Sequence, residues 1–189
     1  MKFYLLLTFI CVPFVLSAQT TLAQRNIFLT TEVRLGHTFE GIYGVLYPND
    51  EEYYMDEEES AKASGMYGIR VITGRYLDPH FSVGVGAGIE GNSGYINSTS
   101  PFFLDLRLHL FNDDEYGYGE HVEGFFYTDF GILHSWNSKF EKGHIFEIGG
   151  GISIMGFTAS IGYNYRRIKD GRINHLNVNS AVASVGYLF

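Results

Sequence analysis

The chain has 189 residues, a formal net charge of −8 at pH 7 and a hydrophobic share of 46 %. A chain of this length without a proline- or serine-rich linker is expected to form one domain. The acidic balance argues against nucleic acid as a partner. The single cysteine, Cys11, lies near the N-terminus, so residues 24–189 have no thiol for a disulfide, a cysteine-ligated zinc ion or a cysteine nucleophile.

Residues 1–23 have the layout of a secretory signal peptide. Lys2 gives a positive start, and a mostly apolar run follows from Phe3 to Leu16. This run is shorter than the roughly 20 residues that a spanning helix needs, so we expect it to be removed after export. Cleavage could follow Ala18 or Ala23, and the tripeptide that ends at Ala23 has the small residues that signal peptidase reads. An exported chain without thiols is typical of a bacterial envelope.

Beyond residue 24 the sequence alternates with the period of a β-strand. No window approaches the apolar length of a transmembrane helix. Apolar residues instead take every second position, with small, polar or charged residues between them. Segments of about 9 to 11 residues show this pattern. They are Ile27–Gly36, Met66–Arg75, Phe81–Glu90, Phe102–Leu110, Phe125–His134, Ile145–Ile154, Phe157–Arg166 and Asn179–Phe189.

Alternation alone does not separate a membrane barrel from a soluble sandwich, because both have one apolar face per strand. The segment length favours the barrel, since a tilted strand needs about 9 to 11 residues to cross a bilayer. Aromatic residues, which include 14 tyrosines and 16 phenylalanines, gather near segment ends as in interfacial girdles. We therefore predict an all-β fold for residues 24–189, an eight-stranded antiparallel up-and-down transmembrane β-barrel.

The connections between segments are expected to alternate, with the longer ones outside the cell. The first outer loop is the longest and carries acids from Glu40 to Glu59. Solvated loop charge is the simplest interpretation, while weak divalent-cation binding or calcium-mediated bridging to lipopolysaccharide is left open. Outer loops are predicted at 37–64, 91–100, 135–144 and 167–176, and inner turns at 76–80, 112–123 and 155–156.

Three stretches resemble a known family. The chain ends Val185-Gly186-Tyr187-Leu188-Phe189, with aromatic or aliphatic residues at alternate positions before the terminal Phe189. This ending resembles the signal that the outer-membrane barrel-assembly machinery reads. The stretches Arg75–Gly86 and Gly162–Arg167 are similar to strands of the small outer-membrane β-barrel family of Bacteroidetes-type bacteria. The resemblance implies an OmpA/OmpX-like barrel in the bacterial outer membrane, and it implies no activity.

The face opposite the apolar one is expected to point into the barrel. Its acids and bases are nearly equal in number, and buried charges are costly unless they are paired. Arginine forks can bridge the carboxylates, and an eight-stranded barrel has little room beyond its own side chains. We therefore predict a plugged lumen without catalytic, cofactor or metal sites. The predicted structural network comprises Glu32, Arg34, Arg70, Glu90, Asp105, Arg107, Asp129, Glu147 and Arg166.

Two further expectations follow from the same register. Charged residues on the predicted lipid face, Arg75 and Arg167, stand near strand ends, where a long side chain can reach the headgroups. The inward glycines are expected to leave space for long side chains. These glycines are at positions 84, 86, 88, 149, 151, 162 and 186.

The preferred function is a non-enzymatic structural or surface-interaction role, with outer-membrane lipid, lipopolysaccharide and an extracellular ligand as partners. A narrow passive porin-like channel is one alternative, and a soluble periplasmic barrel is another. An outer-membrane lipid-modifying hydrolase is also considered, because His134, Ser135, Glu141 and Glu147 resemble the His/Ser/Glu arrangement of lipid A deacylases. Adjacent residues on a strand face opposite sides, however, which separates the histidine from the serine.

Overall fold

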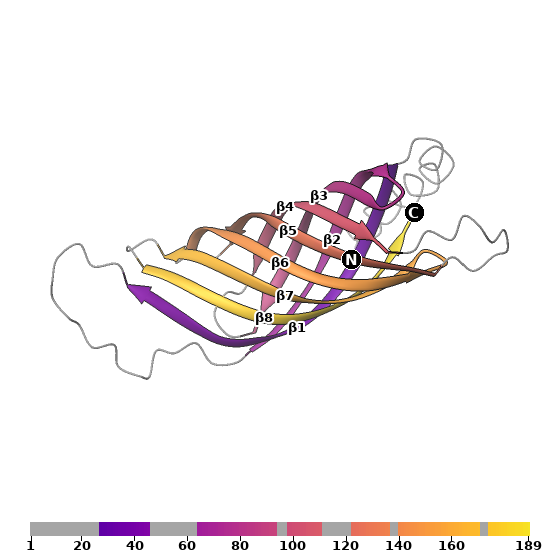
Figure 1. Cartoon of the computed structure of the whole chain (residues 1–189). Coiled ribbons are helices and arrows are strands. Elements are labelled where there is room, and N and C mark those ends of the chain that lie inside the picture. Colours follow the sequence, from indigo (N-terminus) through magenta and orange to yellow (C-terminus); the bar gives the residue numbers. More distant parts are fainter. Residues whose placement is uncertain (1–26, 46–63, 94–97, 111–121, 137–139, 171–173) are drawn as a thin grey trace, which may run out of the picture.

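The structure is a computed structural model that describes residues 27–45, 64–93, 98–110, 122–136, 140–170 and 174–189 (Figure 1). Within these ranges eight strands form one closed antiparallel barrel, in which each strand pairs with the next and β8 pairs with β1. The predicted all-β, eight-stranded up-and-down fold is confirmed. The strands are β1 (Ile27–Val45), β2 (Ser64–Asp78), β3 (Phe81–Asn92), β4 (Thr99–His109), β5 (Val122–Ser135), β6 (Phe140–Ile154), β7 (Phe157–Asp170) and β8 (Asn174–Leu188).

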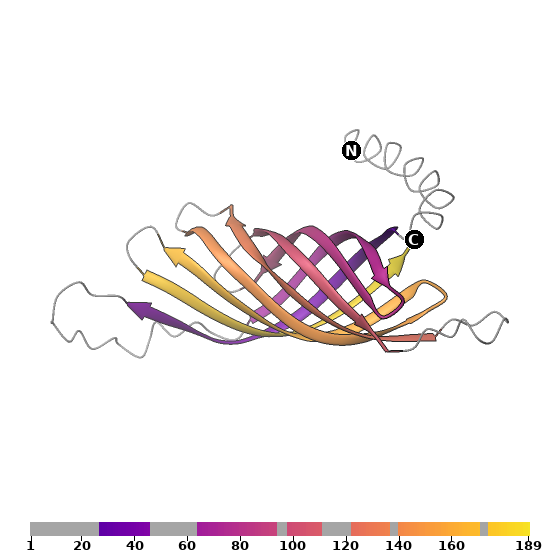
Figure 2. The same cartoon turned by 45° about the horizontal axis from the view of Figure 1, so that its top comes forward.

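The strands wrap obliquely around the barrel, and its two ends differ (Figure 2). One end holds the start of β1, the end of β8 and the turns 79–80 and 155–156. We call this the inner end and the opposite one the outer end. The predicted signal peptide, residues 1–23, and most of the predicted acidic loop, residues 46–63, lie outside the described residues.

The turn between β6 and β7 is the two-residue connection that the sequence predicts. Met155 has a φ of 51° and Gly156 a φ of 83°. Positive φ at both central residues is the requirement of a type I′ turn, whose twist matches that of the flanking strands. At the β2–β3 turn, the backbone N–H of His80 donates to Asp78 Oδ1 over 2.7 Å.

The strands extend further than the sequence predicts, with 11 residues in β4 and 19 in β1. The predicted loop 37–64 is wrong at its start, because β1 continues to Val45 and pairs with β8 there. Much of the predicted loops 135–144 and 167–176 is strand as well. Alternation requires one apolar face and one polar face. Where both faces meet water, backbone pairing can continue without a hydrophobic pattern.

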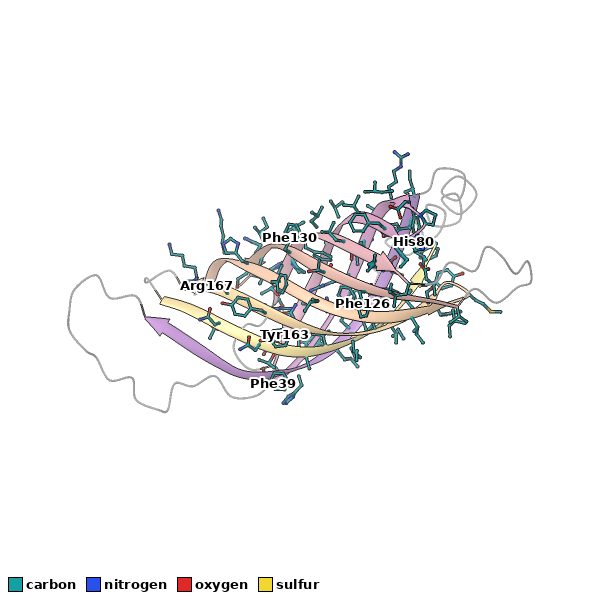
Figure 3. The ribbon with its side chains drawn as sticks, in the orientation of Figure 1. Phe39, His80, Phe126, Phe130, Tyr163 and Arg167 are labelled. Carbon is teal, nitrogen blue, oxygen red and sulfur yellow. The ribbon has the colours of Figure 1, made fainter. Side chains whose placement is uncertain are left out.

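The predicted inward and outward faces are confirmed for the described strands. On β7, Ile161 is 72 % exposed on the outside, whereas Asn164 is fully buried on the inside. Phe126 and Phe130 of β5 also point outward (Figure 3). The period of two therefore separates an apolar outer surface from a largely polar interior.

Candidate functional site

The barrel interior holds the only predicted site residues, and seven strands supply them. All nine are buried, with at most 9 % of any residue exposed. Each stands at an inward position of its strand, so the fold brings together groups that are far apart in sequence. They are Glu32 and Arg34 on β1, Arg70 on β2, Glu90 on β3, Asp105 and Arg107 on β4, Asp129 on β5, Glu147 on β6 and Arg166 on β7.

Glu90 is the centre of the largest group of ion pairs. Its Oε1 accepts a hydrogen bond from Arg70 Nε at 2.6 Å and lies 3.5 Å from Arg34 Nη1. Its Oε2 accepts a hydrogen bond from Arg166 Nη2. One carboxylate therefore faces three guanidinium groups from β1, β2 and β7, which is the kind of pairing that buried charges need.

Glu147 forms a second centre across the barrel from Arg34. The Arg34 Nη2 group donates to Glu147 Oε1, and Arg70 Nη2 lies 3.3 Å from its Oε2. The Tyr127 hydroxyl donates to Oε1 at 2.9 Å, and Asn164 Nδ2 donates to Oε2 at 2.6 Å. The tyrosine and the asparagine thus satisfy acceptor positions that the two arginines leave open.

Arg70 also reaches Asp129, and Arg107 forms a separate group nearer the inner end. The distance from Arg70 Nη1 to Asp129 Oδ2 is 2.9 Å. Arg107 Nε donates to Asp105 Oδ1 at 2.9 Å, and its Nη2 donates to Glu32 Oε1 at 3.3 Å. Every arginine and carboxylate of the predicted network therefore has an opposite charge as its neighbour.

Aromatic rings fill the space around these guanidinium groups. Arg107 lies 5.8 Å from the ring centroid of Phe28 and 5.3 Å from that of Phe125, and Arg70 lies 4.6 Å from that of Phe103. These distances are within the cation–π range. A cation–π contact partly replaces the hydration that an interior guanidinium group lacks.

The inward glycines make room for rings as well as for arginine stems. A Cβ atom at Gly86 would overlap the ring of Phe103, and one at Gly149 or Gly162 would meet Tyr127. A larger side chain at these positions would overlap its neighbours, so only glycine leaves enough space for the rings.

The inner end of the lumen contains a polar cluster around His109. The His109 ring bonds Ser82 Oγ through Nε2 at 2.9 Å, lies beside Tyr76 and pairs with Glu123. A cavity of about 10 Å³ lies among these residues, Arg107 and the neighbouring side chains. That volume is about the size of one water molecule.

An apolar layer at the outer end of the interior was missed by the sequence analysis. Its side chains come from β5 to β8, face inward and are at most 3 % exposed. For Leu133 and Ile145 the signal was present, because their predicted segments have apolar residues on both faces, whereas the members from β7 and β8 lie outside the predicted segments. The layer consists of Leu133, Ile145, Ile168, Leu176 and Val178.

The hydrolase alternative requires a histidine beside a nucleophile. His134 is exposed on the outer face of β5, whereas Ser135 is buried on the inner face. Glu147 lies in the lumen network, and the side chain of Glu141 lies outside the described set. The described residues thus do not bring His134, Ser135 and Glu147 together as acyl transfer requires.

Two further kinds of feature are absent from the described residues. No described helix has the length and apolarity to cross a membrane. No group of three or more His, Cys, Asp or Glu side chains among the described residues could hold a metal ion.

Comparisons with known proteins give structural similarity at low identity. No protein-family model matches the chain. No curated protein matches it. Among solved structures, Neisserial surface protein A (NspA) aligns with a TM-score of 0.48 and 10 % identity over 86 % of this chain and 96 % of that chain. The outer membrane protein OprG from Pseudomonas aeruginosa aligns with a TM-score of 0.44 and 11 % identity over 87 % and 96 %. The N-terminal β-barrel domain of Pseudomonas aeruginosa OprF aligns with a TM-score of 0.41 and 14 % identity over 87 % and 98 %.

Proposed function

We propose that this chain is an integral protein of the bacterial outer membrane, with a sealed, non-conducting barrel and a non-enzymatic structural or surface-interaction role. The observation that carries the proposal is the distribution of side chains. Charged groups are buried and paired inside, while large apolar side chains are exposed outside. A protein folded in water has the opposite preference for both classes.

The exposed apolar surface supports a lipid environment. Outward residues remain about half exposed or more along the barrel wall, among them Leu35 at 65 %, Ile69 at 59 % and Ile161 at 72 %. Monomeric soluble proteins rarely expose contiguous apolar surface on this scale. In a bilayer the same side chains would contact acyl chains, and the closed barrel leaves no unpaired strand edge in the hydrocarbon.

The interior supports a sealed barrel. Between the polar cluster around His109 and the apolar outer layer, the cross-section contains the ion pairs of Glu90 and Glu147. A permeating ion would have to separate buried pairs and then pass Leu133 and its apolar neighbours, and both steps are energetically costly. The cavity of about 10 Å³ beside His109 at the inner end has room for about one water molecule.

The remaining expectations belong to the same proposal. Residues 1–23 act as a cleaved signal peptide, and the strand that ends at Phe189 is the signal for the barrel-assembly machinery. With the chain ends in the periplasm, the outer loops, including the acidic residues 46–63, contact lipopolysaccharide or an extracellular ligand.

Two measurements test this function. Cells that express the protein are fractionated, and the membrane extract is run on a gel with and without boiling. We expect recovery in the outer membrane with a heat-dependent mobility shift, and recovery in the aqueous periplasmic extract would refute the membrane assignment.

The purified protein is then added to planar lipid bilayers, where we expect no stable conductance steps. The comparison variant is Arg70→Ala with Glu90→Ala, which removes one buried ion pair from the lumen and is expected to raise conductance. Regular steps from the wild-type barrel would instead favour the passive channel.

A further inference from the structure

A group of basic side chains stands on the outside of the barrel, close to the outer end of β5, β6 and β7. All of its members are exposed, and Arg167 projects away from the wall (Figure 3). Strand pairing sets His134 opposite Lys142 and His144 opposite Arg167. We call this group the basic rim, and it comprises His134, Lys142, His144, Arg167 and Lys169.

The basic rim lacks acidic partners within the described part of the chain. No described carboxylate forms an ion pair with Lys142, Arg167 or Lys169, whereas every arginine of the lumen network has one. A local excess of positive charge on a chain with a net charge of −8 therefore points to an anion that comes from outside the protein.

The basic rim lines a hollow, and apolar side chains of the same strands follow it towards the inner end. The hollow has a volume of about 410 Å³, and its lining also includes the exposed Ile132 and the buried Leu133 and Gly143. This volume falls within the range of small-molecule sites, about 300 to 1,000 Å³. Towards the inner end, the same strands expose Phe130 at 46 % and Phe146 at 44 %. A ligand that fits both parts has anionic groups at one end and hydrocarbon at the other.

We propose that the basic rim binds the phosphate groups of an outer-leaflet glycolipid, the lipid A part of lipopolysaccharide. Lysine and arginine supply the charge-assisted hydrogen bonds that phosphate prefers. Phe130 and Phe146 provide the surface for its acyl chains. This inference rests on the proposed function, since the outer end faces the outer leaflet only if the chain ends lie in the periplasm. A lipid suits the site better than a soluble polyanion, because the charges and the apolar wall are continuous.

The test uses the full-length barrel in lipid nanodiscs with lipid A as the probe, and native mass spectrometry counts the bound lipid. The variant is Lys142→Gln with Arg167→Gln, and the matched control is Arg75→Gln, an exposed outward arginine near the inner end. We expect the double variant to bind lipid A about 30-fold more weakly, which corresponds to about 2 kcal/mol for two membrane-surface charges. The control should bind as the wild type does.

The second arm compares lipid A with its dephosphorylated form on the wild-type protein, which does not depend on whether any variant folds. Equal binding of the two forms, or an unchanged affinity of the double variant, would overturn the basic rim as a phosphate site. A soluble sulfated polysaccharide that competes as well as lipid A would overturn the choice of a lipid. The heat-dependent mobility shift distinguishes failure of the proposed function from failure of this inference. If the wild type shows no shift, the membrane barrel is refuted. If the shift is present but the double variant binds lipid A unchanged, only the phosphate site at the basic rim is refuted.

Discussion

Glu90 is the most informative residue of the interior to change, because one carboxylate compensates three guanidinium groups. The substitution Glu90→Gln keeps the shape of the side chain and removes its charge. Each attraction at 3 to 4 Å amounts to several kcal/mol at an effective dielectric constant of about 20, but the variant also avoids the desolvation penalty of the carboxylate. Removing one partner of a buried pair typically costs about 3 to 5 kcal/mol, and we expect a loss in that range.

Glu32→Gln is the matched control for this substitution. Glu32 has one arginine partner, Arg107 at 3.3 Å, and that arginine keeps its contact with Asp105 at 2.9 Å. We expect the control to lose about 1.5 to 3 kcal/mol, the range of a hydrogen bond to a charged group. The ratio of the two losses in unfolding free energy is more informative than either loss alone, since both variants change a glutamate to a glutamine inside the same barrel.

The free energy of unfolding is measured by urea titration of the protein in lipid vesicles. Trp136, the only tryptophan of the chain, is 67 % exposed directly after the outer end of β5, so its fluorescence reports the change in its surroundings when the barrel unfolds. A parallel gel assay follows the heat-dependent mobility shift. If Glu90→Gln costs no more than Glu32→Gln, the three arginines do not depend on this carboxylate, and the proposed role of the network is refuted.

Three further predictions use the same unfolding assay. Ile161→Arg, in the middle of the exposed face of β7, should lower the free energy of unfolding by about 2 to 4 kcal/mol. Tyr165→Arg, nearer the outer end, should lower it by about 0 to 1 kcal/mol. Negligible effects of both substitutions would contradict lipid contact. Gly86→Val should lower it by about 1 to 3 kcal/mol through overlap with the Phe103 ring. Adding Phe103→Leu should recover part of that loss, and no recovery would contradict the overlap. Met155→Asn should raise the stability by about 0.5 to 1 kcal/mol, because asparagine tolerates the positive φ of 51° better than methionine; a decrease would speak against strain at this turn.

The barrel and the inward positions of its charges could be predicted because they depend on a period of two. In a closed barrel a strand has one outer and one inner face, so residues such as Val85 and Glu90 are sorted by position alone. Which arginine meets which carboxylate could not be predicted. Arg34 on β1 and Glu147 on β6 meet across the lumen, and that contact depends on strand tilt and stagger, which alternation does not encode.

Two features could not be predicted from the sequence: the apolar layer of the interior and the basic rim of the surface. Both lie near the outer end of the strands. Leu176 and Ile168 face inward near the outer end, but both belong to the predicted loop 167–176, where no strand was expected. Lys142 and Lys169 belong to strand ends that extend beyond the predicted segments, where no hydrophobic pattern marks them, and they were assigned to loops. The basic rim exists only after these strand ends are paired.

The ion pairs that cross the lumen also discriminate between alternative strand registers. A slip of one residue would turn apolar side chains inward and polar side chains outward, which is unfavourable on both faces of the barrel wall. A slip of two residues keeps every face on its proper side, so lipid contact alone cannot reject it. Such a slip would displace Glu90 by about 7 Å along its strand and separate it from the arginines that surround it. The interior ion pairs thus disfavour a two-residue register error during assembly, which lipid contact alone would not disfavour.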